Sequence, residues 1–323
     1  MPSAVDLLYY APGGGLGHAT RAAAILRQAR RLGSASVLAV VTTPHALPLE
    51  HEGLPYHRPA DLSPEGLRAE AAALIRDGRP KVLAVDVFPC GITGELAALL
   101  PLPDCRTVLV ARRLQPQWAA WGPPAWGRFD RVLLAEAWEG AQAPLCSPIL
   151  LRDAEELWPR ARAKAALGAA ADEPVVLGVS SDEPAWTRVF FNLLRKVWAR
   201  LRPSARLRLA SPHLPPDDPL RVDHYPLLEL FNGVDLLVGP CGYNLFHEAQ
   251  ACGVPAVFLP QPRRFDDQYA RAAGSVTANS PEELEMRLRE MMPVKARGEA
   301  AQYVNGARRA IEEIFGPAPL VRS

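Results

Sequence analysis

The stretch GPCGYNLFHEAQACGVPAVFLPQPRRFDDQ, residues 239–268, is the most informative part of this sequence. It follows an apolar run, residues 234–238, which has the length and β-branched content of a buried strand. After a glycine–proline turn, apolar residues recur at helical spacing over residues 243–252, and residues 256–259 form a second apolar run. The order strand, turn, helix, strand predicts one βαβ unit of a parallel sheet.

The turn at the start of that helix is suited to binding a phosphate group. Such a turn presents free backbone N–H groups at a helix N-terminus, where the helix dipole also favours an anion. Glu248 lies about one and a half turns into the same helix, as an acid among apolar neighbours. Taken alone, Glu248 would more often be a solvated helix residue than a ligand, because acidic side chains are mostly exposed.

Length and composition indicate a globular protein with two domains. The chain has 323 residues, which is more than one typical domain, and 49% of them are hydrophobic and 22% charged. The formal net charge is +1, so there is no electrostatic argument for a nucleic-acid partner.

We expect a cytoplasmic protein. No apolar run reaches the roughly 18 residues of a membrane-spanning helix, and residues 1–6 lack the basic and apolar segments of a signal peptide. The cysteines form no CxxC pair, which is typical of small buried residues in a reducing compartment and not of a metal or redox site. Asp266 and Asp267 also lack a further ligand at the spacing of a metal site. The cysteines are Cys90, Cys105, Cys146, Cys241 and Cys252.

Predicted strands and helices alternate along the whole chain, which favours an α/β fold with doubly wound parallel sheets. Besides the unit described above, strands are expected at residues 5–11, 36–41, 81–85, 106–110, 132–135, 175–179, 206–210 and 222–225. Helices are expected at residues 19–32, 64–77, 94–100, 153–167, 186–201, 281–291 and 296–315, with a helical turn at 227–231.

Two segments interrupt this alternation. Residues 114–129 contain three tryptophans and three prolines and are predicted to form a long loop. Packing at the core or at a domain edge is the preferred interpretation, while a wall of an acceptor site or a contact with a membrane interface remains open. Residues 139–151 are poor in periodicity and contain two prolines, so we expect the linker between the domains there.

A second glycine-rich turn, residues 12–18 with the sequence PGGGLGH, lies in the first half. A glycine cluster of this kind could be no more than a tight turn between a strand and a helix. Asp86 comes at the end of a predicted strand of the same half, at the edge of the sheet where ligands bind in such folds. Taken alone, however, Asp86 would more often be a helix cap or a turn residue than a base.

Together the two halves resemble MurG-like glycosyltransferases of the GT-B fold. The family pattern of the second half is a glycine turn, a helix glutamate, G-x-P, an apolar strand and an Asp/Gln cluster. Here these are Gly239 and Gly242, Glu248, residues 253–255, residues 257–260, and Asp266, Asp267 and Gln268.

The first half carries the matching signature, GGGLGHATR at residues 13–21. It resembles the G-x-G-H-x-x-R form of MurG-like transferases, of related sugar-nucleotide hydrolases and of the transferase-like region of plant arabinose kinases. Two motifs in the right order and structural context are stronger evidence than one glycine cluster.

The resemblance implies two Rossmann-like, doubly wound parallel-sheet domains that face a cleft. Residues 1–145 would form the acceptor-side domain, and residues 146–295 would form the domain that binds the nucleotide-sugar. Residues 296–323 would contain a closing helix that packs back on the first domain.

The resemblance also implies a donor site. Glu248 would accept hydrogen bonds from two ribose hydroxyls, because a carboxylate can bind a vicinal diol with both oxygens. The turn before it would bind the diphosphate, and the Asp/Gln cluster would bind sugar hydroxyls. The expected donor residues are Gly14, Gly15, Gly17, Ser180, Ser181, Gly242, Tyr243, Asn244, Glu248, Asp267 and Gln268. The chain departs from the family pattern at Leu245, where threonine is frequent, and at Arg271, where asparagine is frequent.

His18 and Asp86 are the candidates for the catalytic base. An inverting transferase needs a base for the acceptor hydroxyl and electrostatic help for the leaving diphosphate. An imidazole has a pKa in the range for either task, so the role of His18 stays open between the two. Asp86 is the alternative base.

The function that the resemblance implies is transfer of a sugar from a nucleoside-diphosphate sugar, such as a UDP-sugar, to a hydroxyl acceptor. We expect inversion at the sugar, with no catalytic metal and no cofactor besides the nucleotide-sugar co-substrate. The acceptor, whether a small molecule, a glycan or a lipid-linked compound, is not defined, and a peripheral contact with the inner membrane face is open. The alternatives are a nucleotide-sugar hydrolase or epimerase of the same fold and a non-catalytic protein that binds nucleotide-sugars.

Overall fold

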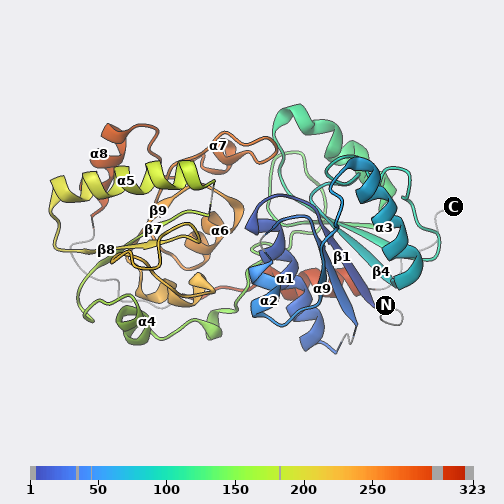
Figure 1. The fold of residues 1–323 in the computed structure, drawn as a ribbon, viewed down its shortest axis with the longest axis horizontal. Helices are drawn as coiled ribbons and strands as arrows, with labels where there is room; N and C mark the ends of the chain where they lie inside the picture. Colours follow the sequence, from blue (N-terminus) through green and yellow to red (C-terminus); the bar gives the residue numbers. More distant parts are fainter. Residues whose placement is uncertain (1–4, 34–35, 45, 182, 293–300, 317–323) are drawn as a thin grey trace. The chain divides into compact units, whose positions relative to one another are not determined.

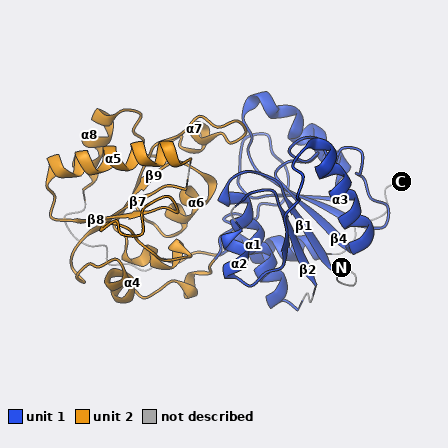
Figure 2. Ribbon diagram, in the orientation of Figure 1, with its two compact units in different colours: residues 1–151, 305–323 blue, residues 152–304 orange. Residues whose placement is uncertain are grey.

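The computed structural model describes residues 5–33, 36–44, 46–181, 183–292 and 301–316 (Figure 1). The chain divides into two compact units (Figure 2). Unit 1 contains residues 1–151 and 305–323, and unit 2 contains residues 152–304. The chain therefore leaves unit 1 once and returns to it with its last helix.

Unit 1 contains a six-stranded parallel sheet with the order β3-β2-β1-β4-β5-β6. This is the strand order of a dinucleotide-binding Rossmann domain, in which the order reverses next to the first strand. The strands are β1 (Leu7–Ala11), β2 (Val37–Val41), β3 (Tyr56–His57), β4 (Val82–Asp86), β5 (Arg106–Ala111) and β6 (Arg131–Leu134). The central strands β1 and β4 are buried along their whole length, as expected for a sheet that helices cover on both faces.

Four α-helices belong to unit 1, namely α1 (Leu16–Arg31), α2 (Leu47–His51), α3 (Pro64–Gly78) and α9 (Gly306–Phe315). Helix α9 packs against α1, although most of the sequence lies between them (Figure 1). The Asn305 side chain caps α9 by accepting from the N–H of Ala307, and it also bonds both backbone groups of Leu150. This bridge joins the returning segment to the end of the first part of unit 1.

Unit 2 contains a four-stranded parallel sheet with the order β10-β9-β7-β8. The strands are β7 (Val175–Val179), β8 (Arg206–Ala210), β9 (Leu236–Gly239) and β10 (Ala256–Phe258). The helices are α4 (Arg160–Ala166), α5 (Pro184–Leu201), α6 (Tyr243–Ala251), α7 (Gln268–Arg271) and α8 (Pro281–Met291). Apolar residues of α5 and α8 form the core on one face of this sheet, and the strand order reverses between β7 and β9.

Five predicted elements differ in the structure. The helix expected at 94–100 is a series of turns, because Gly91 and Gly94 adopt positive φ. Pro159 delays the helix expected from 153, which becomes a 3₁₀ turn η3 (Ala154–Glu156) followed by α4. The strand expected at 222–225 is a single bridge between Leu209 and Arg221.

The other two differences concern the tryptophan-rich segment and the last helix. Residues 114–129 are not an irregular loop but contain two 3₁₀ helices, η1 (Pro116–Trp121) and η2 (Pro123–Arg128), each started by proline. A further 3₁₀ helix, η4 (Leu227–Gly233), occupies the predicted helical turn. Of the helix expected at 296–315, residues 296–300 lie outside the described residues, and α9 begins only after its cap Asn305.

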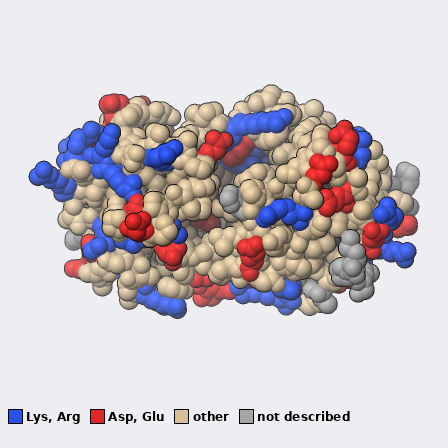
Figure 3. Space-filling model, in the orientation of Figure 1, with Lys and Arg blue, Asp and Glu red and all other residues tan. Residues whose placement is uncertain are grey.

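Basic side chains gather over α5 in the view of Figure 3. Two of them are paired within unit 2, Arg195 with Asp218 and Arg200 with Glu285. The patch is therefore partly neutralised, in agreement with a net charge of +1.

Candidate functional site

In unit 1, the glycine-rich turn and Asp86 lie at the place where the strand order reverses. The turn follows β1, Asp86 ends β4, and these two strands are neighbours. Open α/β sheets bind their ligands at this position, outside the carboxyl ends of the strands. The sheet topology therefore brings together two predicted catalytic residues that are 68 positions apart in the sequence.

Asp86 is completely buried and accepts hydrogen bonds from three side chains. Arg21 binds both carboxylate oxygens, each at 2.6 Å, in the bidentate geometry of strong ion pairs. His18 Nδ1 lies 2.6 Å from Oδ2, and the Tyr9 hydroxyl donates to Oδ1 at 2.9 Å. Arg21 belongs to the glycine-rich sequence motif, but no role could be assigned to it from the sequence alone.

These contacts set the protonation of His18 and Asp86. Burial alone would raise the pKa of Asp86, but the charge of Arg21 and the hydrogen bonds from His18 and Arg21 hold that pKa well below its usual range. For His18, burial lowers the pKa below its ordinary value and outweighs the opposite effect of Asp86. At neutral pH the pair is therefore a carboxylate and a neutral imidazole.

The tautomer of His18 follows from this assignment. An ionised carboxylate only accepts hydrogen bonds, so Nδ1 carries the proton and Nε2 has a lone pair. Within the described residues, Nε2 has no hydrogen-bond partner, and the side chain is 13% exposed. The geometry suits His18 as a base and Asp86 as the residue that orients it, which is the division of labour of a Ser-His-Asp triad without the serine.

Gly13 makes room for the imidazole ring. A Cβ atom at this position would lie 2.4 Å from His18 Cδ2, and the φ of Gly13 is 147°. Its backbone N–H donates to Thr42 Oγ1 at 2.7 Å, which holds the turn against the end of β2.

The N-terminus of α1 is open to an anion. Helix α1 begins at Leu16, so Gly17 and His18 belong to its first turn and not to the turn before it, as the sequence had suggested. Gly15 is its N-cap residue, no side chain caps the helix, and its first turn contains no acidic residue. The exposed Gly14 and Gly15 leave these N–H groups accessible.

In unit 2, the corresponding reversal of strand order lies between β7 and β9, and helix α6 begins at this edge. Gly242 is the N-cap residue of α6, with no side-chain cap and no acidic residue in the first turn. A Cβ at Gly242 would have no atom within 4 Å. Tyr243 is buried with its ring 4.4 Å from that of His247, so only its backbone N–H is placed for a ligand, whereas Asn244 is partly exposed.

Glu248 on α6 is a titratable group of unit 2 whose pKa is clearly shifted by burial. It is half-buried on α6, and in the described part of the chain its carboxyl makes no hydrogen bond or ion pair. Burial raises its pKa to about 7. A desolvated carboxylate without a partner is costly, so such a group is a candidate for ligand binding.

The two serines after β7 differ in exposure. Ser180 is buried, and its hydroxyl shares a hydrogen bond of 2.7 Å with Thr187. Ser181 is exposed at the end of the strand. Of the two predicted phosphate contacts, Ser181 is thus the one with an accessible side chain.

The Asp/Gln cluster lies between β10 and α7, and its side chains are largely engaged within unit 2. Asp267 caps α7 by accepting from the N–H of Ala270. Gln268 is buried, and its Oε1 accepts from the backbone N–H of Gln261 at 3.0 Å. Their predicted contacts with sugar hydroxyls stay predictions.

Arg271 connects this cluster to the glycine turn of unit 2. Its guanidinium donates to the carbonyl of Cys241 at 3.1 Å and to Asp266 at 2.7 Å. In the sequence, Arg271 was only a departure from the family pattern. Its contacts depend on how the loop after β10 folds back, and no local pattern could have indicated them.

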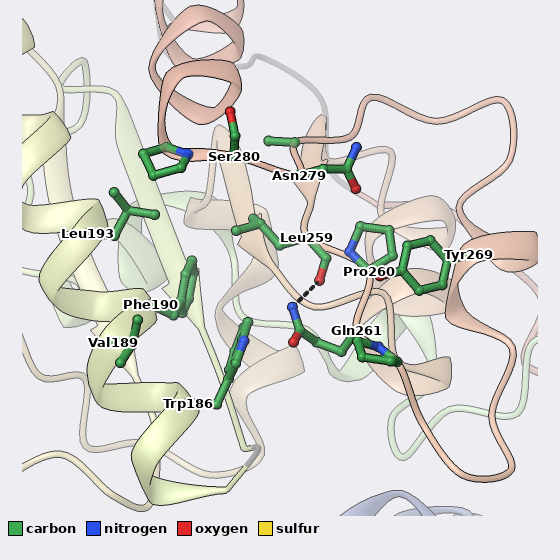
Figure 4. A pocket seen from close by; sticks show the side chains of 13 residues that line it. Trp186, Val189, Phe190, Leu193, Leu259, Pro260, Gln261, Tyr269, Asn279 and Ser280 are labelled. Atoms are coloured by element: carbon green, nitrogen blue, oxygen red, sulfur yellow. Dashed lines mark hydrogen bonds between the residues drawn. The ribbon is translucent and has the colours of Figure 1, made fainter.

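A cavity of about 260 Å³ in unit 2 is lined by residues 259–262 of the loop after β10 and by residues of α5 (Figure 4). Trp186, Phe190 and Tyr269 face it, and Gln261 donates from its amide to the carbonyl of Leu259. None of the described residues that line it is charged.

The comparison with solved structures identifies the fold. MurG of Acinetobacter baumannii aligns with a TM-score of 0.60 at 17% identity, over 97% of this chain and 99% of its own. The spinosyn rhamnosyltransferase SpnG, solved with thymidine diphosphate, aligns with a TM-score of 0.61 at 15% identity, over 96% of both chains. The chain therefore has the predicted GT-B fold, with two α/β bodies and parallel sheets.

The same fold also occurs in a different class of enzyme. The UDP-GlcNAc 2-epimerase of Methanocaldococcus jannaschii, in complex with UDP-GlcNAc and UDP, aligns with a TM-score of 0.64 at 11% identity, over 95% of this chain and 98% of its own.

No protein-family model and no curated protein matches the sequence. Among the described residues, no helix has the length and apolarity to span a membrane, and no cluster of three or more His, Cys, Asp or Glu is arranged to hold a metal.

Proposed function

We propose that the protein is a glycosyltransferase that moves a sugar from a nucleoside-diphosphate sugar to a hydroxyl acceptor. The observation that carries this proposal is Glu248, a desolvated carboxyl without a partner, on a helix whose N-terminus is open to a diphosphate. In its ionised form Glu248 accepts hydrogen bonds from both ribose hydroxyls. Solved proteins of this fold were obtained with thymidine diphosphate and with UDP, which supports a nucleoside-diphosphate donor.

Unit 1 supplies the base in this proposal. His18 takes the proton of the acceptor hydroxyl at Nε2, and Asp86 stabilises the imidazolium that forms. The acceptor oxygen attacks the sugar from the side opposite the diphosphate, so the reaction inverts the anomeric centre. The dipole of α6 and the N–H groups at its start stabilise the leaving diphosphate without a catalytic metal.

The test of the donor site is nucleotide binding by Glu248→Gln across pH. We expect UDP to bind the parent more tightly as the pH rises through about 7, because the ionised carboxylate accepts both ribose hydroxyls. Glu248→Gln should bind at least tenfold more weakly at pH 8, the equivalent of about 1.4 kcal/mol, and without this pH dependence. Isothermal titration calorimetry measures both.

The exposed Glu282 on α8 provides a matched control, and Glu282→Gln should bind like the parent. Equal nucleotide affinity in Glu248→Gln and the parent would show that the donor site is elsewhere. The same control separates loss of a specific contact from a general change in charge.

A hydrolase or epimerase is the second candidate, favoured by the alignment with the UDP-GlcNAc 2-epimerase. In such an enzyme, water or the sugar itself would replace the acceptor. Incubation with UDP-GlcNAc and no acceptor distinguishes the candidates, because a transferase leaves the sugar-nucleotide essentially intact. Release of free sugar would indicate a hydrolase, and formation of an epimer would indicate an epimerase. Either result would contradict the transferase proposal.

A further inference from the structure

Aromatic side chains of unit 1 extend outward from the ring of His18. The ring of Phe88 lies 5.5 Å from that of His18, and Trp121 meets Phe88 edge-on at 5.8 Å. Trp118 then lies 4.9 Å from Trp121. Four rings therefore form one continuous series that begins at the candidate base.

The series changes from buried to partly exposed along its length. Phe88 is 1% exposed, so it supports the neighbouring rings from below and cannot itself offer a face to a ligand. Trp118 and Trp121 are only half-buried. They are carried by η1, a short segment that begins with Pro116 and is kinked at Trp118.

The backbone at Val87, between Asp86 and Phe88, has a strained conformation that sets the direction of the Phe88 side chain. Val87 has a φ of 66°, which is a rare conformation for a β-branched residue. The N–H of Phe88 donates to the carbonyl of Asp86 at 2.7 Å, so the chain reverses over a single residue. Strain of this kind is concentrated at functional sites. Here it directs the Phe88 ring toward His18 immediately after the strand that supplies Asp86.

Trp126, a close neighbour in sequence, shows that this arrangement is not shared by every indole of the segment. Its ring meets Trp138 at 6.1 Å, and both pack against the apolar core beneath the sheet. Core packing therefore accounts for the position of Trp126.

We propose that Trp121 and Trp118 form the acceptor subsite, and that the acceptor is a compound whose hydroxyl is carried by a ring with a flat, largely apolar face. An indole binds such a face with a large contact area and little loss of side-chain freedom. Aromatic rings and the C–H faces of sugar rings share this chemistry. The inference rests on the proposed transfer reaction for its chemical step, but not for the binding itself.

In the transfer step the ring hydroxyl lies at His18 Nε2 while the ring system extends over Trp121. The O–H proton moves to Nε2, and the oxygen forms the new bond to the anomeric carbon of the donor. The bond from that carbon to the diphosphate oxygen breaks, and its electron pair stays on the diphosphate. Asp86 then faces an imidazolium, which its charge stabilises.

Direct binding of acceptor probes to the full chain, without donor, tests the subsite. The probes are 4-methylumbelliferone for aromatic rings, methyl β-glucoside for sugar rings and 1,4-butanediol as an acyclic alcohol, measured by saturation-transfer NMR and calorimetry. We expect at least one of the two ring compounds to bind about tenfold more tightly than the acyclic alcohol. Trp121→Ala should abolish that preference while UDP binding is unchanged.

Two further variants keep the result interpretable. Trp186→Ala removes an indole from the cavity of unit 2 and should leave ring binding unchanged. Trp118→Ala removes the indole that lies one ring farther from His18, and it should also weaken the binding of ring compounds. This variant replaces Trp121→Ala as the test if Trp121→Ala does not fold. Ring binding that persists in both η1 variants, or that is lost in Trp186→Ala, would overturn the subsite.

The readouts also separate this inference from the proposed function. Failure of any nucleoside diphosphate to bind, with ring binding at Trp121 intact, would overturn the transferase and leave the aromatic subsite standing. Tight nucleotide binding with no preference for ring compounds would overturn the aromatic subsite and leave the proposed transferase standing.

Discussion

His18 and Asp86 act as one unit at the scale of single residues. The carboxylate receives two hydrogen bonds from Arg21 and one each from His18 and Tyr9. Its low pKa makes it a poor proton acceptor, whereas the neutral imidazole has a free lone pair at Nε2. This geometry supports His18 as the proposed base, with Asp86, the alternative base in the sequence, as its hydrogen-bond partner.

Substitutions at the two residues should have different effects. His18→Gln should lower kcat by about 10²–10⁴, because general base catalysis is lost, with little change in stability. Asp86→Asn should also lower kcat, and it should destabilise the fold by about 3–5 kcal/mol because Arg21 is left buried without its carboxylate. Steady-state kinetics and urea unfolding measure the two effects. His57→Gln, at a partly buried pair with Glu70 away from the candidate site, is the control.

The pH dependence of both residues has a defined sign. Because the pKa of His18 is lowered, the acid limb of kcat/KM should lie below pH 6.5. Because the pKa of Asp86 is depressed on folding, its stabilisation is present above the carboxyl's unfolded pKa near 3.8 and is lost as the pH falls below that value. An acid limb above pH 6.5 would contradict the assignment of His18.

Both residues could be predicted from the sequence, but their contacts could not. A histidine after a glycine turn and an acid at a strand end are visible as local patterns. Their hydrogen bond depends on β1 and β4 being neighbours, and the order of strands in a sheet is a property of the whole unit. The positive φ of Val87 has no local signal at all, since valine is among the least suited residues for it.

At the scale of elements, the β9–α6 unit shows two different uses of glycine. A Cβ at Gly239 would lie 2.5 Å from the carbonyl oxygen of Val179, so this glycine allows two strands and α6 to approach closely. Gly242 has open space around its Cα at the start of the helix. The first glycine serves packing, and the second leaves room for a ligand.

Paired substitutions separate these roles. Gly239→Ala should destabilise the protein by about 1–3 kcal/mol, as overpacking does. Gly242→Ala should cost less than about 1 kcal/mol in stability but weaken UDP binding, because a methyl group enters the space before the helix N-terminus. Thermal unfolding and calorimetry give the two quantities. Full nucleotide affinity in Gly242→Ala would argue against a diphosphate at this turn.

Elements with strong local signals were predicted well. Helix α8 has Ser280 as its cap and Pro281 at its first position, and its predicted bounds of 281–291 agree with the structure. The predicted helix at 94–100 was wrong because the buried carboxylate of Glu95 instead binds the N–H groups of Ile92 and Thr93 and stabilises turns. Side-chain bonds of this kind compete with a helix and cannot be seen in apolar periodicity.

At the scale of the whole molecule, unit 1 depends on residues from both ends of the sequence. Helix α9 buries Ile311 and Ile314, and Glu313 pairs with Arg131 of β6. The Arg106 side chain also donates to the carbonyl oxygens of Glu313 and Gly316. The last helix is therefore part of the core of unit 1.

A chain that ends at residue 304 should lose this contribution. Two buried isoleucines at about 1.5–3 kcal/mol each imply a loss on the order of 5 kcal/mol, comparable with the whole stability of a small domain. Urea unfolding, monitored by tryptophan fluorescence, should then show a transition of unit 1 at lower urea concentration. The transition of unit 2 should be unchanged. A chain that ends at residue 316 keeps α9 and should behave like the parent. Equal midpoints for the two truncations would contradict the role of α9.

The interrupted order of unit 1 also has a consequence during synthesis on the ribosome. All six strands of its sheet are made before residues 152–304, yet α9 emerges only after them. At a translation rate of about 5–20 residues per second, α1 waits roughly 14–55 seconds between the synthesis of its last residue and the start of its partner helix. During this interval the nascent chain exposes the apolar face that α9 later covers, so the first half of the protein is the part that we expect to need a chaperone.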